Sequence, residues 1–207
     1  MRFERSSSHT IICGVDEAGC GPWAGPVCAA AVVLDRTKIP RGLNDSKKLT
    51  EAEREHLFPL IMVSADVGVG LASAQEIDEI NILQATYLAM ARAVAALKSK
   101  PTLALVDGNR APKLFCGTQC IIGGDGKSFS IAAASIIAKV TRDRLMRELE
   151  KAFPVYGFAK HKGYGTPGHA GALAKHGPCR EHRHSFAPIR KLTMKPDIDS
   201  HGDSKDS

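Results

Sequence analysis

The chain has 207 residues, of which 43% are hydrophobic and 24% charged, and its formal net charge is +6. These values are close to those of globular proteins and exclude a largely disordered chain. The longest apolar run, residues 27–34, is too short to cross a bilayer, and the N-terminus lacks the apolar stretch of a signal peptide. We therefore expect a cytoplasmic protein that is a monomer, binds no membrane and keeps its six cysteines reduced.

Positive charge is concentrated in the C-terminal third. Residues 139–194 contain 12 Lys and Arg against 4 Asp and Glu, whereas residues 1–138 contain 14 of each class. This asymmetry is typical of a surface that binds a polyanion, although a solvated basic surface would have the same composition. The polar, Asp-rich end of the chain predicts one domain over residues 1–192 and a disordered tail over residues 193–207.

Apolar patterning predicts an α/β domain. Strands are expected at residues 11–15, 27–34 and 67–71, forming an antiparallel meander, with a short helix that starts after Thr50 and has a capping box completed by Glu53. A long helix over residues 76–97 and strands at 103–106 and 119–122 follow. A second long helix is expected over 130–152, and short helical pieces such as 170–175 beyond it. This order of elements predicts a mixed sheet flanked by helices.

Three aspartates share one context. Asp16, Asp107 and Asp125 each follow a predicted strand and precede a turn that contains glycine. Sites assemble at strand ends in α/β sheets, so we expect these side chains to meet. Glu17 would join them only if the chain leaves strand geometry there, because neighbouring strand residues point to opposite faces. The alternative is that each aspartate only caps a helix or stabilises a turn.

Converging carboxylates need protons or cations to neutralise them, and hard oxygen ligands suit Mg²⁺ or Mn²⁺. With a polyanionic partner, the chemistry that this predicts is phosphodiester hydrolysis with two metal ions. No competing motif is as coherent, since the P-loop and nucleophile-elbow patterns are absent. Five histidines in the basic third are expected at the surface or in phosphate contact rather than in a metal site: His161, His169, His176, His182 and His184.

Seven segments, in order along the chain, resemble the blocks of the ribonuclease HII family. The resemblance covers roughly residues 10–192, and such ordered blocks are far more specific than any single motif. They are GVDEAGCGPWAGPV (14–27), LNDSKKL (43–49), EIDEINILQAT (76–86), VDGN (106–109), AASIIAKVTRD (133–143), HKGYGT (161–166) and RHSFAPI (183–189).

The resemblance implies an RNase H-like fold, with three antiparallel and then two parallel strands, flanking helices and a basic helical C-terminal part. It also implies cleavage of RNA paired with DNA and of a single ribonucleotide embedded in duplex DNA. Cleavage would fall on the 5′ side of the ribonucleotide and leave 3′-hydroxyl and 5′-phosphate ends. By the same resemblance Asp16, Glu17 and Asp107 are metal ligands, and Asp125 matches the fourth acid of the site.

Substrate contacts are implied by the resemblance as well. Gly19, Cys20 and Gly21 match the tripeptide whose backbone reads the 2′-hydroxyl, and Tyr164 matches a tyrosine that packs on the following deoxyribose. The family usually has Arg at the position of Cys20, often Ser at Ala132 and commonly Arg at His184, so a phosphate contact is expected to be lost at Cys20. Ahead of the first helix, the segment with Asn44, Ser46, Lys47 and Lys48 could bind phosphate or simply begin the helix.

Two other functions fit parts of this pattern. A related nuclease of the RNase H-like superfamily, such as a Holliday-junction resolvase, would cleave four-way DNA without needing a ribonucleotide. A non-catalytic nucleic-acid-binding module would have no need of the complete set of four acids. Cleavage of duplex DNA that carries one ribonucleotide would separate the three hypotheses.

Overall fold

The computed structural model describes residues 11–193. A five-stranded sheet with the order β3-β2-β1-β4-β5 forms its centre. Strands β1, β2 and β3 are antiparallel neighbours, whereas β4 runs parallel to β1 and β5 runs parallel to β4. This arrangement confirms the predicted mixed sheet. The strands are β1 (Ile12–Ala18), β2 (Val27–Leu34), β3 (Ala65–Ala72), β4 (Leu103–Asp107) and β5 (Gly117–Ile121).

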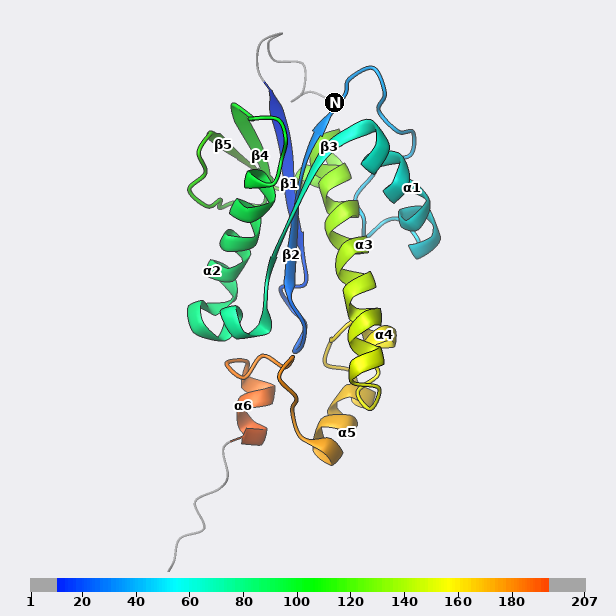
Figure 1. Cartoon of the computed structure of the whole chain (residues 1–207), viewed down its shortest axis with the longest axis vertical. Helices are drawn as coiled ribbons and strands as arrows, with labels where there is room; N and C mark the ends of the chain where they lie inside the picture. Colours follow the sequence, from blue (N-terminus) through cyan, green and yellow to red (C-terminus); the bar gives the residue numbers. More distant parts are fainter. Residues whose placement is uncertain (1–10, 194–207) are drawn as a thin grey trace, which may run out of the picture.

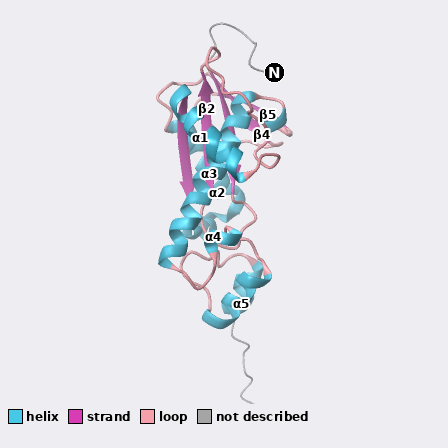
Figure 2. Cartoon of the chain, turned by 90° about the vertical axis from the view of Figure 1, so that its right-hand side faces the viewer, coloured by secondary structure: helices cyan, strands magenta, loops and turns pink. Residues whose placement is uncertain are grey.

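Helices cover both faces of the sheet (Figure 1). Helix α2 lies on one face and helices α1 and α3 on the other, while α4, α5 and α6 form a separate group beyond one end of the sheet (Figures 1 and 2). Within residues 11–193, no helix is both long and apolar enough to span a membrane. The helices are α1 (Glu51–Ser64), α2 (Ala74–Ala95), the 3-10 turn η2 (Gly124–Gly126), α3 (Phe129–Ala152), α4 (Phe158–His161), α5 (Pro167–His176) and α6 (Ala187–Thr193).

Strand β2 is buried on both faces, which explains its uninterrupted apolar sequence. Its odd-numbered residues, such as Ala29, pack in the core beneath α2, and its even-numbered residues, such as Ala30, pack with α1 and α3. On the adjacent β1, a Cβ atom added to Gly14 would lie 2.1 Å from the main-chain carbon of Ser130. The missing side chain therefore lets the start of α3 approach the sheet closely, next to the strand that carries Asp16 and Glu17.

Helix α2 differs from its prediction. It begins two residues before the predicted start, at a capping box between Ser73 and Glu76, and it is interrupted at Asn81, whose φ of 65° is left-handed. The Asn81 side-chain oxygen accepts the main-chain N–H groups of the second segment's first turn. The predicted helix over 76–97 is therefore present but not continuous, and Ile80 and Leu83, which have helical spacing in the sequence, are exposed beside the break.

The C-terminal part has a small core of its own, formed by residues such as Met146, Phe158 and Leu173. His169 and His182 are buried in it, so the expectation that all five histidines lie at the surface or contact phosphate is wrong. Helix α5 is longer than the predicted 170–175. Helix α6 ends at Thr193, one residue past the predicted domain boundary, and the rest of the predicted tail lies outside the described residues.

Candidate active site

Asp16 and Asp107 lie side by side at one edge of the sheet. Strands β1 and β4 are parallel and pair Val15 with Val106, so the next residue of each strand is an aspartate. Asp125 joins them from η2, the turn between β5 and α3. One carboxylate oxygen from each of the three residues lies within 4.8 Å of the other two. The structure thus brings together the three aspartates that the sequence places after strands.

Glu17 occupies a different position. Strand β1 continues through Asp16 and Glu17 to Ala18, and Glu17 pairs with Ala29 of β2. The chain therefore does not leave strand geometry at Asp16, and the pleat directs Glu17 to the face covered by α2. On that face the Cys20 thiol lies 3.8 Å from the Glu17 Oε1 atom. The carboxylate nevertheless stays close enough to Asp107 for that residue's negative charge to raise the pKa of Glu17, in addition to the effect of burial.

The cluster carries more negative charge than its protein surroundings neutralise. Burial, followed by the charges of Glu17 and Asp107, raises the pKa of Asp16 well above its usual value. Burial, Asp107 and Asp45 raise the pKa of Asp125. In residues 11–193, no Lys, Arg or His forms an ion pair with Asp16, Asp107 or Asp125. Three converging, unpaired carboxylates form a donor set that fits a hard divalent cation.

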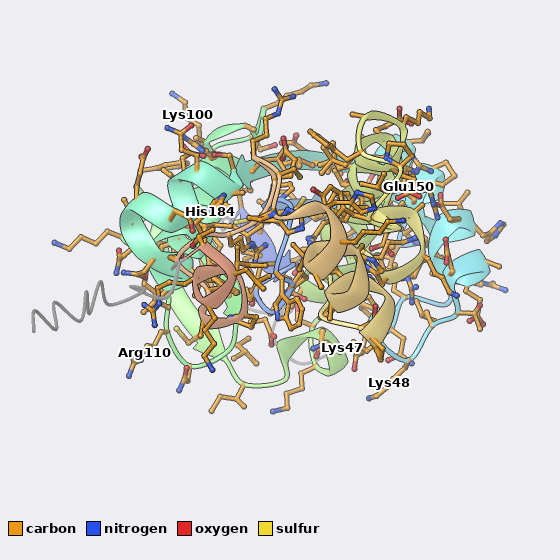
Figure 3. The ribbon with its side chains drawn as sticks, turned by 90° about the horizontal axis from the view of Figure 1, so that it is seen from below. Lys47, Lys48, Lys100, Arg110, Glu150 and His184 are labelled. Atoms are coloured by element: carbon orange, nitrogen blue, oxygen red, sulfur yellow. The ribbon has the colours of Figure 1, made fainter. Side chains whose placement is uncertain are left out.

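A groove of about 260 Å³ lies beside the cluster and is lined at one point by Glu17, the neighbour of Asp16 in β1. The loop after β1, the loop before α1, helix α3 and Tyr164 form its walls. Figure 3 shows Lys47 and Lys48 on the same side of the molecule as Arg110, with Lys100 and Glu150 on the opposite side. The residues that line the groove are Glu17, Ala18, Gly19, Cys20, Gly21, Ser46, Lys47, Arg54, Lys139, Arg142 and Tyr164.

The groove unites most of the substrate-contact residues suggested by the sequence, which are far apart in the chain. Asn44 and Lys48 are the exceptions, because both are exposed and lie outside the groove. The Asn44 side-chain oxygen accepts the main-chain N–H of Asp45, and the Lys48 Nζ atom lies 3.9 Å from the Asp45 carboxylate. Ser46 and Lys47 line the groove, although Ser46 is buried. The loop that holds them is braced by Arg54, which donates to the main-chain oxygens of Ser46 and Leu49.

Sequence reasoning missed several residues of this region. Arg54, Lys139 and Arg142 line the groove, and Asp45 lies against Asp125. Lys139 also forms an ion pair of 2.7 Å with Asp143. Asp45 could have been found from its position within the segment 43–49, and Lys139 and Arg142 from theirs within 133–143. Nothing local to Arg54 distinguished it from other charged residues of a surface helix.

The loop after β1 is packed tightly against Arg142. The Arg142 guanidinium is buried and donates to the main-chain oxygens of Ala24, Pro26 and Lys162. A Cβ atom added to Gly19, whose φ is +101°, would lie 2.0 Å from the Arg142 Nε atom. Glycine is therefore required at residue 19 by both backbone conformation and space.

Comparison with known proteins identifies the family. The family model described as Ribonuclease HII matches residues 13–189. The chain belongs to the ribonuclease HII family. It is 58% identical to the ribonuclease HII of Parvibaculum lavamentivorans over 193 residues, which span 93% of this chain and 72% of that protein. It is also 58% identical to the ribonuclease HII of Burkholderia pseudomallei over 182 residues, 87% of this chain and 85% of the relative.

Solved ribonuclease structures share the fold. The ribonuclease H2 of Pyrococcus horikoshii aligns with a TM-score of 0.73 and 30% identity, covering 87% of this chain and 96% of that one. An Archaeoglobus fulgidus RNase HII, solved in complex with PCNA, aligns with a TM-score of 0.71 and 28% identity over 85% and 95% of the two chains. Bst-RNase HIII, solved with Mn²⁺, is 19% identical with a TM-score of 0.67 over 91% of this chain and 70% of that chain, a likeness of fold alone.

As a member of this family, the protein is a ribonuclease H of type HII, a hydrolase that acts on RNA–DNA hybrids and depends on divalent metal ions. The family assignment therefore favours the ribonuclease over the resolvase and the non-catalytic binding module. The three-aspartate cluster agrees with the metal dependence, because it offers oxygen ligands and unneutralised negative charge at one point.

Proposed function

We propose that this ribonuclease HII cleaves RNA strands paired with DNA, and single ribonucleotides embedded in duplex DNA, on the 5′ side of the ribonucleotide. Cleavage leaves 3′-hydroxyl and 5′-phosphate ends. The observation that supports this proposal is that Glu17, which directly follows Asp16 of the three-aspartate cluster, lines the same groove as Gly21 and Tyr164. A Cβ atom added to Gly21 would lie 3.6 Å from the Tyr164 ring. A reacting phosphate at the cluster would thus have its own nucleotide and the next sugar in reach of these residues.

Asp16, Asp107 and Asp125 are the proposed metal ligands, with Glu17 as a fourth carboxylate approaching from the α2 face. When bound, two divalent cations, Mg²⁺ or Mn²⁺, would supply an activated water and charge stabilisation for the leaving oxygen. The bond between phosphorus and the 3′ oxygen breaks, the oxygen of water becomes part of the 5′-phosphate, and the 3′ oxygen takes up a proton. The carboxylates would provide the negative charge that holds the cations at this edge of the sheet.

Ribonucleotide recognition is assigned to the main chain of residues 19–21. At a single nucleotide, only the 2′-hydroxyl distinguishes RNA from DNA, so its recognition requires short polar contacts. Gly19 and Gly21 have no side chains to keep a sugar away from the peptide groups. The Tyr164 ring, 48% exposed beside Gly21, would stack on the deoxyribose that follows and disfavour a 2′-hydroxyl there.

Phosphate contacts are assigned to the loop before α1. Ser46 and Lys47 line the groove together with Tyr164, where they could bind the backbone of the cleaved strand. Asn44 lies outside the groove, so a role for it requires a phosphate further along the duplex.

The test uses three end-labelled duplexes of one sequence: all-DNA, DNA with one internal ribonucleotide, and an RNA–DNA hybrid. We expect cleavage of the second and third but not the first, in Mg²⁺ or Mn²⁺ and not in EDTA. Products should carry a 3′-hydroxyl that a DNA polymerase extends and a 5′-phosphate that a ligase accepts. Cleavage on the 3′ side of the ribonucleotide, or no cleavage of the singly substituted duplex, would contradict the proposal.

A further inference from the structure

Arg183 is a buried residue whose guanidinium binds the main chain of the loop after β1. Its Nη2 atom donates to the Gly19 oxygen at 2.6 Å, its Nη1 atom to the Cys20 oxygen at 3.0 Å, and its Nε atom to the Gly25 oxygen at 3.0 Å. The side chain has no exposed surface, and no ion pair within residues 11–193 includes it. All three nitrogens of Arg183 thus donate to carbonyl oxygens of one loop.

These bonds determine where the N–H groups of the same peptides point. In a trans peptide the C=O and N–H groups point in opposite directions, and the described residues contain no cis peptide bond. Because the Gly19 and Cys20 oxygens face Arg183, the N–H groups of Cys20 and Gly21 face away from it. Neither N–H has a hydrogen-bond partner in the described part of the chain, and both residues line the groove.

The guanidinium also polarises these peptides. A hydrogen bond to a charged donor is stronger than one between neutral groups, and it increases the donor strength of the N–H at the other end of the peptide. Burial and the neighbouring Arg142 lower the pKa of Arg183 to about 9, which still leaves the side chain protonated at neutral pH. Burying a charge without a carboxylate partner opposes stability, so packing alone does not account for arginine at this position.

We propose that Arg183 is a positioning residue that determines ribonucleotide specificity: from beneath the loop, it directs the N–H groups of Cys20 and Gly21 at the 2′ oxygen of the substrate. The inference rests on the proposed function and deepens it, because it identifies a residue that orients the N–H groups of Cys20 and Gly21 without contacting the substrate. Two adjacent N–H donors on one side of a loop form a concavity suited to a partly negative oxygen.

The segment that carries Arg183 is anchored on both sides. The Arg183 N–H donates to the Trp23 oxygen at 2.8 Å, and His182 forms an isolated bridge with Ala24. On the other side the Asp78 carboxylate of α2 accepts the N–H groups of His184 and Ser185, both at 2.8 Å, and the Ser185 hydroxyl at 2.6 Å. Asp78 therefore offers a second, milder way to disturb Arg183.

The test measures binding with Ca²⁺ in place of Mg²⁺, so that cleavage does not interfere. The probes are a duplex with one ribonucleotide and the all-DNA duplex of the same sequence, and the readout is the ratio of their dissociation constants. In Arg183→Lys a single ammonium nitrogen replaces the three nitrogens of the planar fork, and a buried lysine tends to lose its charge. We expect the ratio to fall about tenfold, the effect of losing a charge-assisted hydrogen bond, with all-DNA binding changed less than about twofold.

Tyr156→Phe is the matched control, because it removes another buried side-chain bond to a main-chain oxygen of the C-terminal part, that of Gly177. It should lower the melting temperature without changing the ratio. If Arg183→Lys does not fold, Asp78→Asn carries the test, with an expected loss of about threefold in the ratio.

An unchanged ratio in the folded variant, or equal losses with both duplexes, would show that Arg183 is only structural. Wild-type protein without any preference for the ribonucleotide would overturn the proposed function and this inference together. Preference in the wild type that persists in both variants would overturn the inference alone.

Discussion

His169 and His182 face each other through their Nε2 atoms, 3.0 Å apart, in the interior of the C-terminal part. The His169 Nδ1 atom lies 2.9 Å from the Tyr164 oxygen, which can only accept, so the His169 proton lies on Nδ1. The His182 Nδ1 atom lies 2.9 Å from the Cys179 nitrogen and 3.3 Å from the Cys179 oxygen. In the shorter contact Nδ1 accepts the Cys179 N–H, which places the His182 proton on Nε2, facing His169. Both rings are thus neutral, and an additional proton on either one would leave two donors facing each other.

This pair predicts acid-sensitive stability. Burial, followed by the charge of His169, lowers the pKa of His182 to about 4, and burial also lowers the pKa of His169. Between pH 6.5 and 4 these histidines bind protons in the unfolded chain but not in the folded chain. The free energy of unfolding is therefore unaffected by them above about pH 6.5 and decreases as the pH falls toward 4. For His182 the loss is on the order of 3 kcal/mol. Denaturant unfolding between pH 7 and pH 4 measures it.

His182→Asn is the control, since its side-chain oxygen can still accept the Cys179 N–H. We expect a lower free energy of unfolding at pH 7 and a flatter dependence on pH. A variant whose pH dependence matches that of the wild type would show that groups other than His182 cause the acid sensitivity.

Asp107→Asn should abolish cleavage and spare binding. The substitution removes one negative charge from the three-aspartate cluster, where no described cationic side chain is paired. We expect cleavage to fall at least about 100-fold at physiological Mg²⁺. Affinity for the hybrid in Ca²⁺ should change little, because phosphate contacts dominate it. Near-normal cleavage would contradict the assignment of Asp107 as a metal ligand.

Tyr164→Ala should affect junction recognition more than catalysis. The ring lies at the groove wall and is half exposed, so removing it has little effect on folding. We expect kcat/KM for the singly substituted duplex to fall about tenfold further than that for a long RNA–DNA hybrid. Equal losses with both substrates would assign Tyr164 a structural role.

Cys20→Ala should retain ribonucleotide discrimination. The Sγ atom lies 3.4 Å from the Thr86 hydroxyl and 3.8 Å from Glu17, so the side chain contacts α2 and β1. Recognition of the 2′-hydroxyl is assigned to the main chain instead. Burial raises the pKa of the thiol to about 11, so it carries no charge at neutral pH. The ratio of dissociation constants should stay within about twofold of wild type, well under the effect of a lost hydrogen bond. A collapse of the ratio would mean that the thiol itself contacts the sugar.

Gly19→Ala and Gly21→Ala should differ sharply. Alanine at residue 19 would be strained by the positive φ and would collide with Arg142, whereas at residue 21 the nearest atom is 3.6 Å away. We expect Gly19→Ala to lower stability by about 1–3 kcal/mol and to lose most activity. Gly21→Ala should fold normally and lose affinity only for substrate, as comparison of melting temperatures and dissociation constants would show. Equal stability of the two variants would contradict the requirement for glycine at residue 19.

The sequence by itself determined those features that depend on neighbours along the chain. The apolar run of β2 and the capping box at Thr50 were predictable because they follow from local alternation and local hydrogen bonds. The meeting of Asp16, Asp107 and Asp125 was predictable as well, since parallel strands present their carboxyl ends at one edge of a sheet.

Tertiary structure alone decided the remainder. The division of Asp16 and Glu17 between two faces depends on how far β1 keeps its pairing with β2, and the burial of His169 and His182 depends on how α5 packs. Arg183 reaches the oxygens of Gly19 and Cys20 across more than 160 residues of chain. No local pattern indicates such a contact, because packing between distant elements, and not the propensity of either segment, brings the two groups together.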